Sequence, residues 1–299
     1  MSKSRIGILC SEHHGDIALC TSVLKYKDKL WPNKDIVWFC GLAPERATFL
    51  DILKYNDAIL EIREWPNVFF KEIMDENAQL RYDKKNDFEQ LKDIEVGYFP
   101  APWAALPNNA LNAVNYANIP RMIYGADPSW EWHPYLGFSD EEREQAKDFC
   151  AALPHSKTVM LETQLKSAGD FKVDEGSIKN MMQLCREKWG KCNFIFASKL
   201  DYSHLFDDPG VVSCSHFTVR QCALIHNHCD LFIGVCSGIS VTSSCWGNKP
   251  VPRVEMGGSM VDYTLIANGP VISVICDNWS REQMKVGFER GVQEALNKF

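Results

Sequence analysis

Short apolar runs alternate with amphipathic stretches along the first half of the chain. The runs have the length and composition of buried strands, and the stretches between them carry apolar residues at helical spacing. Strands are expected at residues 5–10, 35–40, 58–62 and 94–99, and helices from about residue 16, at 44–55 and at 68–92. This alternation of strand and helix is typical of a parallel sheet wound with helices.

The second half of the chain repeats this pattern. Strands are expected at residues 157–162, 193–197, 211–213 and 230–235, and helices at 141–153, 178–189, 217–226, 241–247 and 281–297. A chain of 299 residues is long enough for two domains with separate cores. We therefore predict an α/β protein with two parallel-sheet domains, one over residues 1–150 and one over residues 151–299.

Composition argues against several classes of protein. Hydrophobic residues make up 45% of the chain and aromatic residues 11%, which is typical of a globular protein. The net charge of −7 and the lack of basic runs argue against a nucleic-acid-binding surface. There is no stretch of about 20 apolar residues to span a membrane, and the polar start leads into the first strand without a signal peptide. We therefore expect a cytoplasmic protein whose 12 cysteines are reduced.

One group of cysteines and histidines has a spacing that can bind a metal. Cys222, His226 and Cys229 lie at positions i, i+4 and i+7 of one predicted helix, with His228 beside them. Ligands on one helix face can bind zinc. However, the sequence has no pair of cysteines separated by two residues, and cysteine is among the most buried residue types. We interpret these residues as buried thiols and predict no metal site.

The first expected strand runs into a turn that carries His13, His14, Gly15 and Asp16. Glycine permits a tight turn, and the unpaired N–H groups at the start of the next helix favour an anion or a polar substrate. Asp16 is expected at the carboxyl end of the strand, where ligands bind in open α/β sheets. It is therefore either an acid in a binding site or the N-cap of the helix, since Asp is a preferred capping residue.

The strand expected at residues 230–235 runs into a similar turn, formed by Ser237, Gly238, Ile239 and Ser240. The hydroxyl groups and free N–H groups of such a turn can hold a phosphate, although Gly238 can also simply serve a tight turn. One such turn in each half predicts a cleft with an anion bound on one wall and an acid on the other.

Two loops are rich in aromatic residues and proline. Residues 100–109 include Trp103 and follow an expected strand. This loop either helps to form an acceptor pocket or packs on the surface. Residues 127–135 include Trp130 and Trp132, whose rings either contact a sugar or form a hydrophobic plug between domains.

Two segments of the chain carry the motifs of a known family. In the first half they comprise the turn at Gly15 and Asp16, followed by Thr21, Leu24, Pro32 and Ile36. In the second half they lie at residues 223–225, 229–234, 237–238 and 247–250. Together the two segments cover about a quarter of the chain in the right order. The chain therefore resembles the heptosyltransferase-like glycosyltransferases, which include the ADP-heptose:lipopolysaccharide enzymes.

The resemblance implies a GT-B fold, in which two Rossmann-like domains face a cleft. The amino-terminal domain would hold the acceptor, the carboxyl-terminal domain would bind a nucleoside-diphosphate sugar, and the last helix would pack back on the first domain. The resemblance also implies inverting sugar transfer without a required metal or cofactor. Cys236 and Val241 depart from the family, which often has Asp and commonly has His there, so the sugar of the donor stays open.

Within that framework, Asp16 is predicted to be the general base that removes the proton of an acceptor hydroxyl. The turn at residues 237–240 would stabilise the departing diphosphate together with Lys166 or Lys199, although either lysine can equally be a solvated surface residue. The other predicted contacts are Thr163, Gln164, Gly238, Ile239 and Glu255 for the donor, with Glu255 at its ribose, and His13, His14, Gly15 and Trp103 for the acceptor. The acceptor is a hydroxyl-bearing molecule such as a glycan or a lipid-linked glycan.

Two other functions fit the same pattern. A nucleotide-sugar epimerase or hydrolase of this fold would act on its nucleotide-sugar without an acceptor. A non-catalytic nucleotide-sugar-binding protein would fit the departures at Cys236 and Val241. A dehydrogenase is disfavoured, because no Gly-x-Gly-x-x-Gly motif follows the first strand.

Overall fold

Contacts between Cα atoms divide the chain into two compact units, Met1–Gly137 and Phe138–Phe299. The computed structural model describes residues 4–10, 13–40, 49–64, 79, 81, 87–98, 100, 118–165, 171–197, 202, 207–257, 267–275 and 281–299. The division falls just before the helix expected at 141–153, so this helix belongs with the second unit. The acceptor and donor roles of the two halves stay a prediction.

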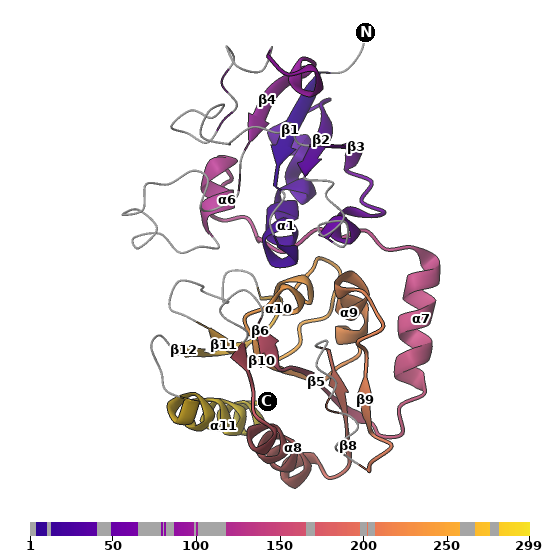
Figure 1. Ribbon diagram of the computed structural model, residues 1–299, viewed down its shortest axis with the longest axis vertical. Helices are drawn as coiled ribbons and strands as arrows, with labels where there is room; N and C mark the ends of the chain where they lie inside the picture. The colour runs from indigo at the N-terminus through magenta and orange to yellow at the C-terminus, as the bar shows by residue number, and fades with distance from the viewer. Residues whose placement is uncertain are drawn as a thin grey trace. The chain divides into compact units, whose positions relative to one another are not determined.

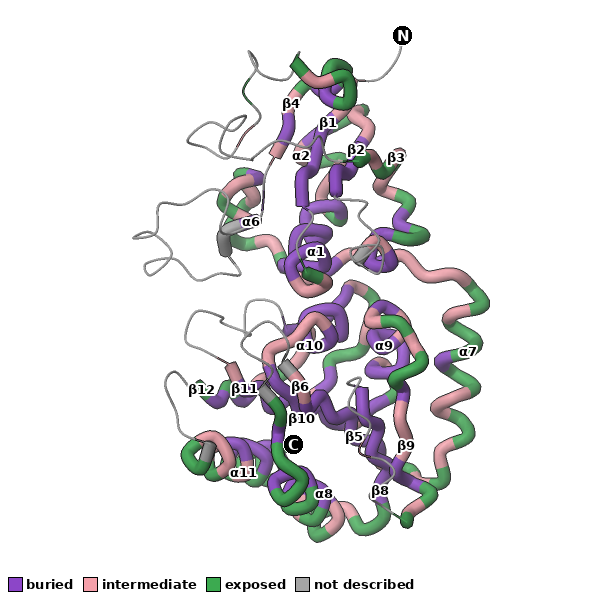
Figure 2. Tube along the Cα trace, viewed as in Figure 1, coloured by how far each residue is buried: buried purple, intermediate pink, exposed green. Residues whose placement is uncertain are grey.

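The first unit contains a four-stranded parallel sheet with the order β3-β2-β1-β4 (Figure 1). The strands are β1 (Arg5–Leu9), β2 (Asp35–Cys40), β3 (Ile59–Glu64) and β4 (Ile94–Tyr98). Strands β1 and β2 are almost wholly buried (Figure 2), which is why both appear in the sequence as nearly continuous apolar runs. The predicted β-α-β order of this half is confirmed.

Short helices follow the strands of the first unit. They are α1 (His14–Thr21), the 3₁₀ turn η1 (Ser22–Tyr26), α2 (Lys27–Leu30), the 3₁₀ turns η3 (Phe49–Leu53) and η4 (Glu89–Leu91), and α6 (Asn118–Ile123). The described end of the helix predicted at 44–55 is therefore a 3₁₀ turn. Most of the helix predicted at 68–92 lies outside the described residues.

The second unit contains a six-stranded parallel sheet with the order β12-β11-β10-β5-β8-β9 (Figure 1). The strands are β5 (Lys157–Glu162), β8 (Cys192–Phe196), β9 (Val211–Ser213), β10 (Leu231–Val235), β11 (Arg253–Gly257) and β12 (Val271–Ile275). A small antiparallel pair, β6 (Gln164–Leu165) and β7 (Phe171–Lys172), follows β5. Strands β5 and β9 have the predicted bounds.

Helices cover both faces of this second sheet. They are α7 (Asp140–Ala151), α8 (Glu175–Trp189), α9 (Val219–His226), α10 (Gly238–Thr242) and α11 (Arg281–Lys298). Helices α8 and α11 pack on one face, whereas α9 and α10 lie on the other and α7 packs against α9 (Figure 1). Helix α11 thus packs on the sheet of its own unit, and its predicted contact with the first unit stays a prediction.

One helix begins earlier than the sequence predicts. The short helix expected at 241–247 is α10, which begins at Gly238 because Ser237 caps it, and ends at Thr242. Gly247 has a positive φ of 87°, so it lies in the following turn.

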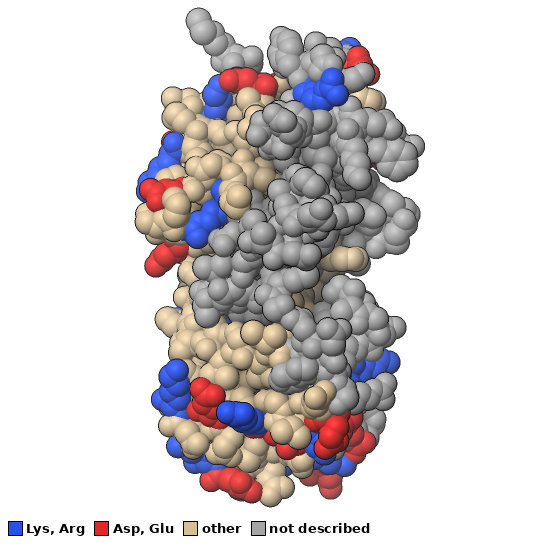
Figure 3. Space-filling view, turned by 90° about the vertical axis from the view of Figure 1, so that its left-hand side faces the viewer, with Lys and Arg blue, Asp and Glu red and all other residues tan. Residues whose placement is uncertain are grey.

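Three features of the described residues bear on possible partners and on redox state: membrane-spanning helices, surface charge and cysteines. No helix in the part of the chain that the structure describes is both long and apolar enough to cross a membrane. On the described part of the face in Figure 3, Lys and Arg side chains lie among Asp and Glu side chains. The described cysteines are free thiols, and most of them are buried.

Candidate functional site

The turn after β1 is held by the neighbouring strand. The N–H of Cys10 donates to the carbonyl oxygen of Phe39 at 3.1 Å, and the indole of Trp38 donates to the carbonyl oxygen of Cys10 at 3.0 Å. The chain therefore leaves the sheet in a fixed direction before α1 begins. His13 precedes the helix in an extended conformation, and His14 and Gly15 form its first turn. These residues lie at the carboxyl end of β1, as predicted.

Asp16 has a structural role in this turn, but it is not the N-cap. The N-cap is His13, and Oδ2 of Asp16 accepts a hydrogen bond of 3.2 Å from the backbone N–H of His13. This is the N3 position of a capping box, where an acidic side chain reaches back to the residue before the helix. The Asp16 side chain is buried and held close to the helix start, which orients its carboxylate.

The aromatic segment of the first unit packs within that unit. Trp130 stacks on Tyr26 with ring centroids 4.3 Å apart, and Trp132 is buried. The backbone N–H of Tyr135 donates to Oγ1 of Thr21 at 3.0 Å, which ties the segment to α1. The ring of Trp132 is thus part of the core of the first unit, whereas Trp130 and Tyr135 are partly exposed.

The described segments that were predicted to bind the donor lie at one edge of the sheet of the second unit. Strand β10 lies between β11 and β5, and Gly234 of β10 is in register with both Glu255 and Glu162. Thr163 and Gln164 directly follow β5, while the 237–240 turn follows β10. Because parallel strands all end at the same edge, the structure brings these segments together where ligands bind in open α/β sheets.

The turn from Ser237 to Ser240 differs from the expected one. Oγ of Ser237 accepts hydrogen bonds of 3.2 Å from the N–H groups of both Ile239 and Ser240. Oγ of Ser240 in turn accepts a bond of 3.1 Å from the N–H of Ser237. The two hydroxyls and three of the N–H groups are therefore paired with one another in a capping box, and not free for a phosphate as predicted. A ligand at this turn would have to exchange these bonds for its own.

Glu255 lies inside the protein, beneath α10. Its side chain is fully buried, and Oε1 accepts a bond of 2.7 Å from the guanidinium of Arg253, which is also buried. The same guanidinium donates to the carbonyl oxygen of Ser240 at 3.0 Å and to Oγ of Ser243 at 2.8 Å. It also donates to Nε2 of His226 at 3.3 Å. Glu255 was predicted to contact the ribose of a donor, but here it binds Arg253 behind the turn.

Burial changes the protonation of this cluster. Desolvation raises the pKa of Glu255 to about 7, although the Arg253 guanidinium and a hydrogen bond from Ser240 oppose the rise. Desolvation also holds the pKa of His226 well below its ordinary value, and the charges of Arg253 and Lys249 lower that pKa further. Because Arg253 can only donate, Nε2 of His226 accepts and the imidazole is neutral.

We expect Glu255 to make stability fall as the pH rises. Its pKa is about 7 in the fold against an ordinary 4.5, so the native state holds the proton more tightly than the unfolded chain. The resulting stabilisation is complete below pH 4.5 and is lost as the pH rises through 7. The wild type should lose about 3 kcal/mol more than Glu255→Gln between pH 4.5 and 8, measured by urea unfolding.

The Glu255→Gln comparison isolates this group. His226 acts in the opposite direction, because its lowered pKa gives stability that is lost as the pH falls below 6.5. Both proteins retain His226, Arg253 and Lys249, so their contributions cancel in the difference. Parallel pH profiles for the two proteins would show that Glu255 does not titrate in this range.

Several solved structures to which this chain is similar are glycosyltransferases. The glycosyl transferase family 9 protein from Veillonella parvula has a TM-score of 0.62 and 15% identity, and the match covers 97% of each chain. Heptosyltransferase WaaC from E. coli, solved with ADP, has a TM-score of 0.59 and 12% identity over 97% of this chain and 99% of that one. The iron-containing dodecameric glycosyltransferase TibC from E. coli has a TM-score of 0.60 and 12% identity, covering 99% of this chain and 76% of that one.

The chain has a GT-B fold. The predicted fold class is thus confirmed, and the resemblance to heptosyltransferase-like proteins is confirmed at the level of the fold. A scan of the sequence against models of protein families and a search of curated proteins found no match.

Several predicted site residues of this GT-B chain lie outside the described residues: Trp103, Lys166 and Lys199. The described residues hold no group of three or more His, Cys, Asp and Glu side chains able to bind a metal. The cysteines and the histidine whose spacing resembles that of metal ligands have separate partners. Cys222 lies 3.7 Å from the sulfur of Cys214, and His226 binds Arg253.

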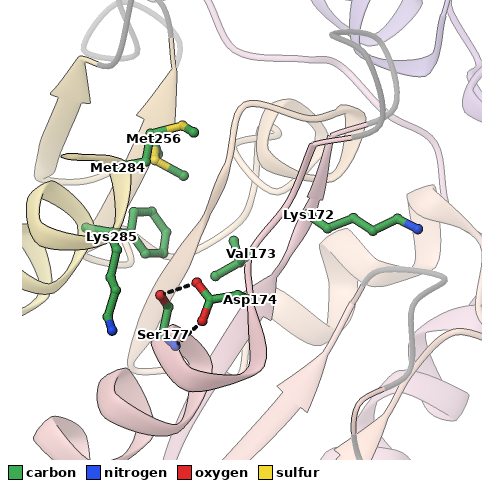
Figure 4. Close-up of a pocket in the computed structure, with 8 residues that line it drawn as sticks. Lys172, Val173, Asp174, Ser177, Met256, Met284 and Lys285 are labelled. Carbon is green, nitrogen blue, oxygen red and sulfur yellow. Dashed lines mark hydrogen bonds between the residues drawn. The ribbon is translucent and has the colours of Figure 1, made fainter. Parts of the chain in front are cut away.

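A small pocket of about 50 Å³ lies between β7, α8 and α11, on the face of the second unit's sheet that is opposite to α9 and α10 (Figure 4). Its lining includes Val173, Met256 and Met284, and Asp174 caps α8 there by accepting the N–H of Ser177 at 3.0 Å. Of the predicted donor residues that the structure describes, none lines this pocket.

Sequence reasoning did not name Arg253 as a support of the 237–240 turn, and it assigned Glu255 a different role. Arg253 and Glu255 are two positions apart on a strand, so they share one face of the sheet. That spacing, in a strand with apolar neighbours, is the signal that could have identified a buried ion pair. The contribution of His226 from α9 had no such signal.

Proposed function

We propose that the protein is an inverting glycosyltransferase that moves a sugar from a nucleoside-diphosphate sugar to an acceptor hydroxyl. Asp16 acts as the general base and removes the hydroxyl proton while the oxygen attacks the anomeric carbon. The diphosphate leaves from the opposite face of the sugar.

The observation that carries this proposal is the Asp16 carboxylate at the start of α1. It is buried at the carboxyl end of β1, where the fold places ligands, and its bond to the N–H of His13 fixes its direction. A base must be held in place to reach a hydroxyl proton, so the capping bond supports the catalytic role. We assign binding of the acceptor to His13, His14, Gly15 and Trp103.

The donor binds at the carboxyl edge of the second sheet. Thr163, Gln164 and the 237–240 turn converge there, and Lys166 or Lys199 balances the charge of the diphosphate. WaaC, which shares the fold, was solved with ADP, and this supports a nucleoside diphosphate as the leaving group. A glycan is the acceptor class that fits the fold, because the related proteins include lipopolysaccharide heptosyltransferases.

A non-catalytic nucleotide-sugar-binding protein is the second candidate. The observation that favours it is Cys236, which replaces the acid that is common at this position in the family the chain resembles.

A panel of nucleoside diphosphates and their sugars tests the proposal. A ligand at one hundred times its dissociation constant stabilises a protein by about 2.7 kcal/mol, which a thermal-shift assay detects. Incubation of the stabilising nucleotide-sugar with glycan acceptors should then transfer sugar to the acceptor. An altered free nucleotide-sugar would indicate an epimerase or hydrolase, and binding without turnover a binding protein. The assay is repeated with a chelator, since TibC contains iron; unchanged turnover supports metal-independent transfer.

A further inference from the structure

We propose that Arg253 and Glu255 are positioning residues that hold helix α10, and with it the donor turn at Ser237 and Gly238, in the geometry that receives the diphosphate. This inference rests on the proposed function. In this inference the buried ion pair affects donor binding without contacting the donor.

Helix α10 is too short to hold its own shape. It comprises only five residues, and isolated helices of that length are unstable in water. Its amino end is closed by the capping box of Ser237 and Ser240. Its other end is held from below, because Arg253 donates to the carbonyl oxygen of Ser240 and to the hydroxyl of Ser243, the C-cap. A cation is favourable at the carboxyl end of a helix, where unpaired carbonyl oxygens gather.

A charged pair inside a parallel sheet needs an explanation. Strands covered on both faces are normally apolar throughout, and a buried ion pair often adds no stability over apolar residues of similar volume. Arg253 and Glu255 are nevertheless buried side by side on β11, with the guanidinium 5.1 Å from the ring centroid of Phe232. All the other hydrogen-bond partners of the Arg253 guanidinium among the described residues lie in α9, in α10 or at its end. The pair is therefore directed at this short helix.

Glu255 and His226 orient the guanidinium. Oε1 of Glu255 binds Nη1, the atom that also reaches Ser240, while Nε2 of neutral His226 accepts from Nη2, the atom that also reaches Ser243. Each of the two terminal nitrogens of Arg253 is thus shared between an orienting acceptor and α10. These hydrogen bonds fix the position of α10 relative to β11.

Loss of this support lowers donor affinity by a predictable route. The apparent dissociation constant of a ligand rises in inverse proportion to the fraction of protein in the binding-competent conformation. If α10 is correctly placed in one molecule in ten, the affinity falls about tenfold without the loss of any contact to the ligand.

The test measures the affinity of the nucleoside diphosphate that best stabilises the wild type, by calorimetry below the melting temperature of each variant. Arg253→Met should weaken binding about tenfold or more, and Arg253→Lys, which keeps the charge and some donors, should restore part of it. Hydrogen exchange of the amides of Ile239 and Ser240 should become faster in Arg253→Met. If that variant does not fold, Arg253→Lys still carries the test, with an intermediate loss of affinity.

The control is Asn193→Leu, a buried polar lesion in the same unit. Asn193 donates to His155 and to Thr158 at the amino ends of β5 and β8, far along the strands from the donor turn. This variant should lose stability without a change in affinity or in α10 exchange. Equal weakening in Asn193→Leu and Arg253→Met, or unchanged affinity in folded Arg253→Met, would overturn the inference alone. A wild type that binds no nucleoside diphosphate would overturn the proposed function. In that case, unchanged hydrogen exchange of α10 in Arg253→Met would also overturn the role of Arg253 in holding this helix.

Discussion

Asp16→Asn should lower turnover by about 10²- to 10⁴-fold, which is the usual contribution of general-base catalysis. The amide cannot take up the proton of the acceptor hydroxyl. Its oxygen can still accept the hydrogen bond that Oδ2 of Asp16 receives from the N–H of His13, so the capping box should survive. The loss should therefore appear in the turnover number, while donor affinity and the melting temperature move little.

Turnover of Asp16→Asn is measured per folded enzyme, with the donor and acceptor that the nucleotide-sugar panel identifies. Asp16→Ala provides the control, because it removes both the base and the capping oxygen. It should match Asp16→Asn in turnover but melt at a lower temperature, since loss of a cap costs about 1 kcal/mol. A variant Asp16→Asn that melts early and retains its turnover would show that Asp16 is only a helix cap.

Arg220→Met should destabilise the second unit by about 3–5 kcal/mol, a large part of the stability of an ordinary domain. Arg220 of α9 is buried, and Nη1 lies 2.6 Å from Oε2 of Glu142 in α7, while Nη2 binds Oε1. Glu142 also accepts the N–H of Ser139 at 3.0 Å in the capping box of α7. Without the guanidinium, a carboxylate with little exposure is left unpaired, which is costly.

The effect of Arg220→Met is measured by urea unfolding and by hydrogen exchange at the amides of α7 and α9. The matched control is Lys147→Met on the same helix α7, where Lys147 and Glu144 form an exposed pair at 3.0 Å. Exposed pairs are worth at most about 1 kcal/mol, so this variant should stay near the wild type. Equal losses from the two variants would mean that burial does not determine the strength of the α7–α9 pair.

The hydrophobic pattern predicted most of the two sheets. Residues 35–40 and 157–162 coincide with β2 and β5, because strands covered on both faces need apolar residues at nearly every position. Residues 211–213 coincide with the short edge strand β9. The family motifs predicted the GT-B fold, which the solved structures confirm. Helix ends were less predictable: α10 begins at Gly238 and not at Val241, because the capping bonds of Ser237 decide its start.

The sequence alone determined the order in which strands and helices follow one another along the chain. It also determined the two turns and the position of Asp16 at the carboxyl end of β1. These follow from local patterns, since a strand's burial and a helix's start are encoded within a few residues. Only the tertiary structure decided that Glu255 lies behind the 237–240 turn with Arg253 and His226, and that Arg220 pairs with Glu142. The residues of these pairs lie in different elements or on one face of a strand, so tertiary packing decides which of them become neighbours. A buried charge is stable only beside an opposite charge or a hydrogen-bond partner, and the local sequence does not show which group that will be.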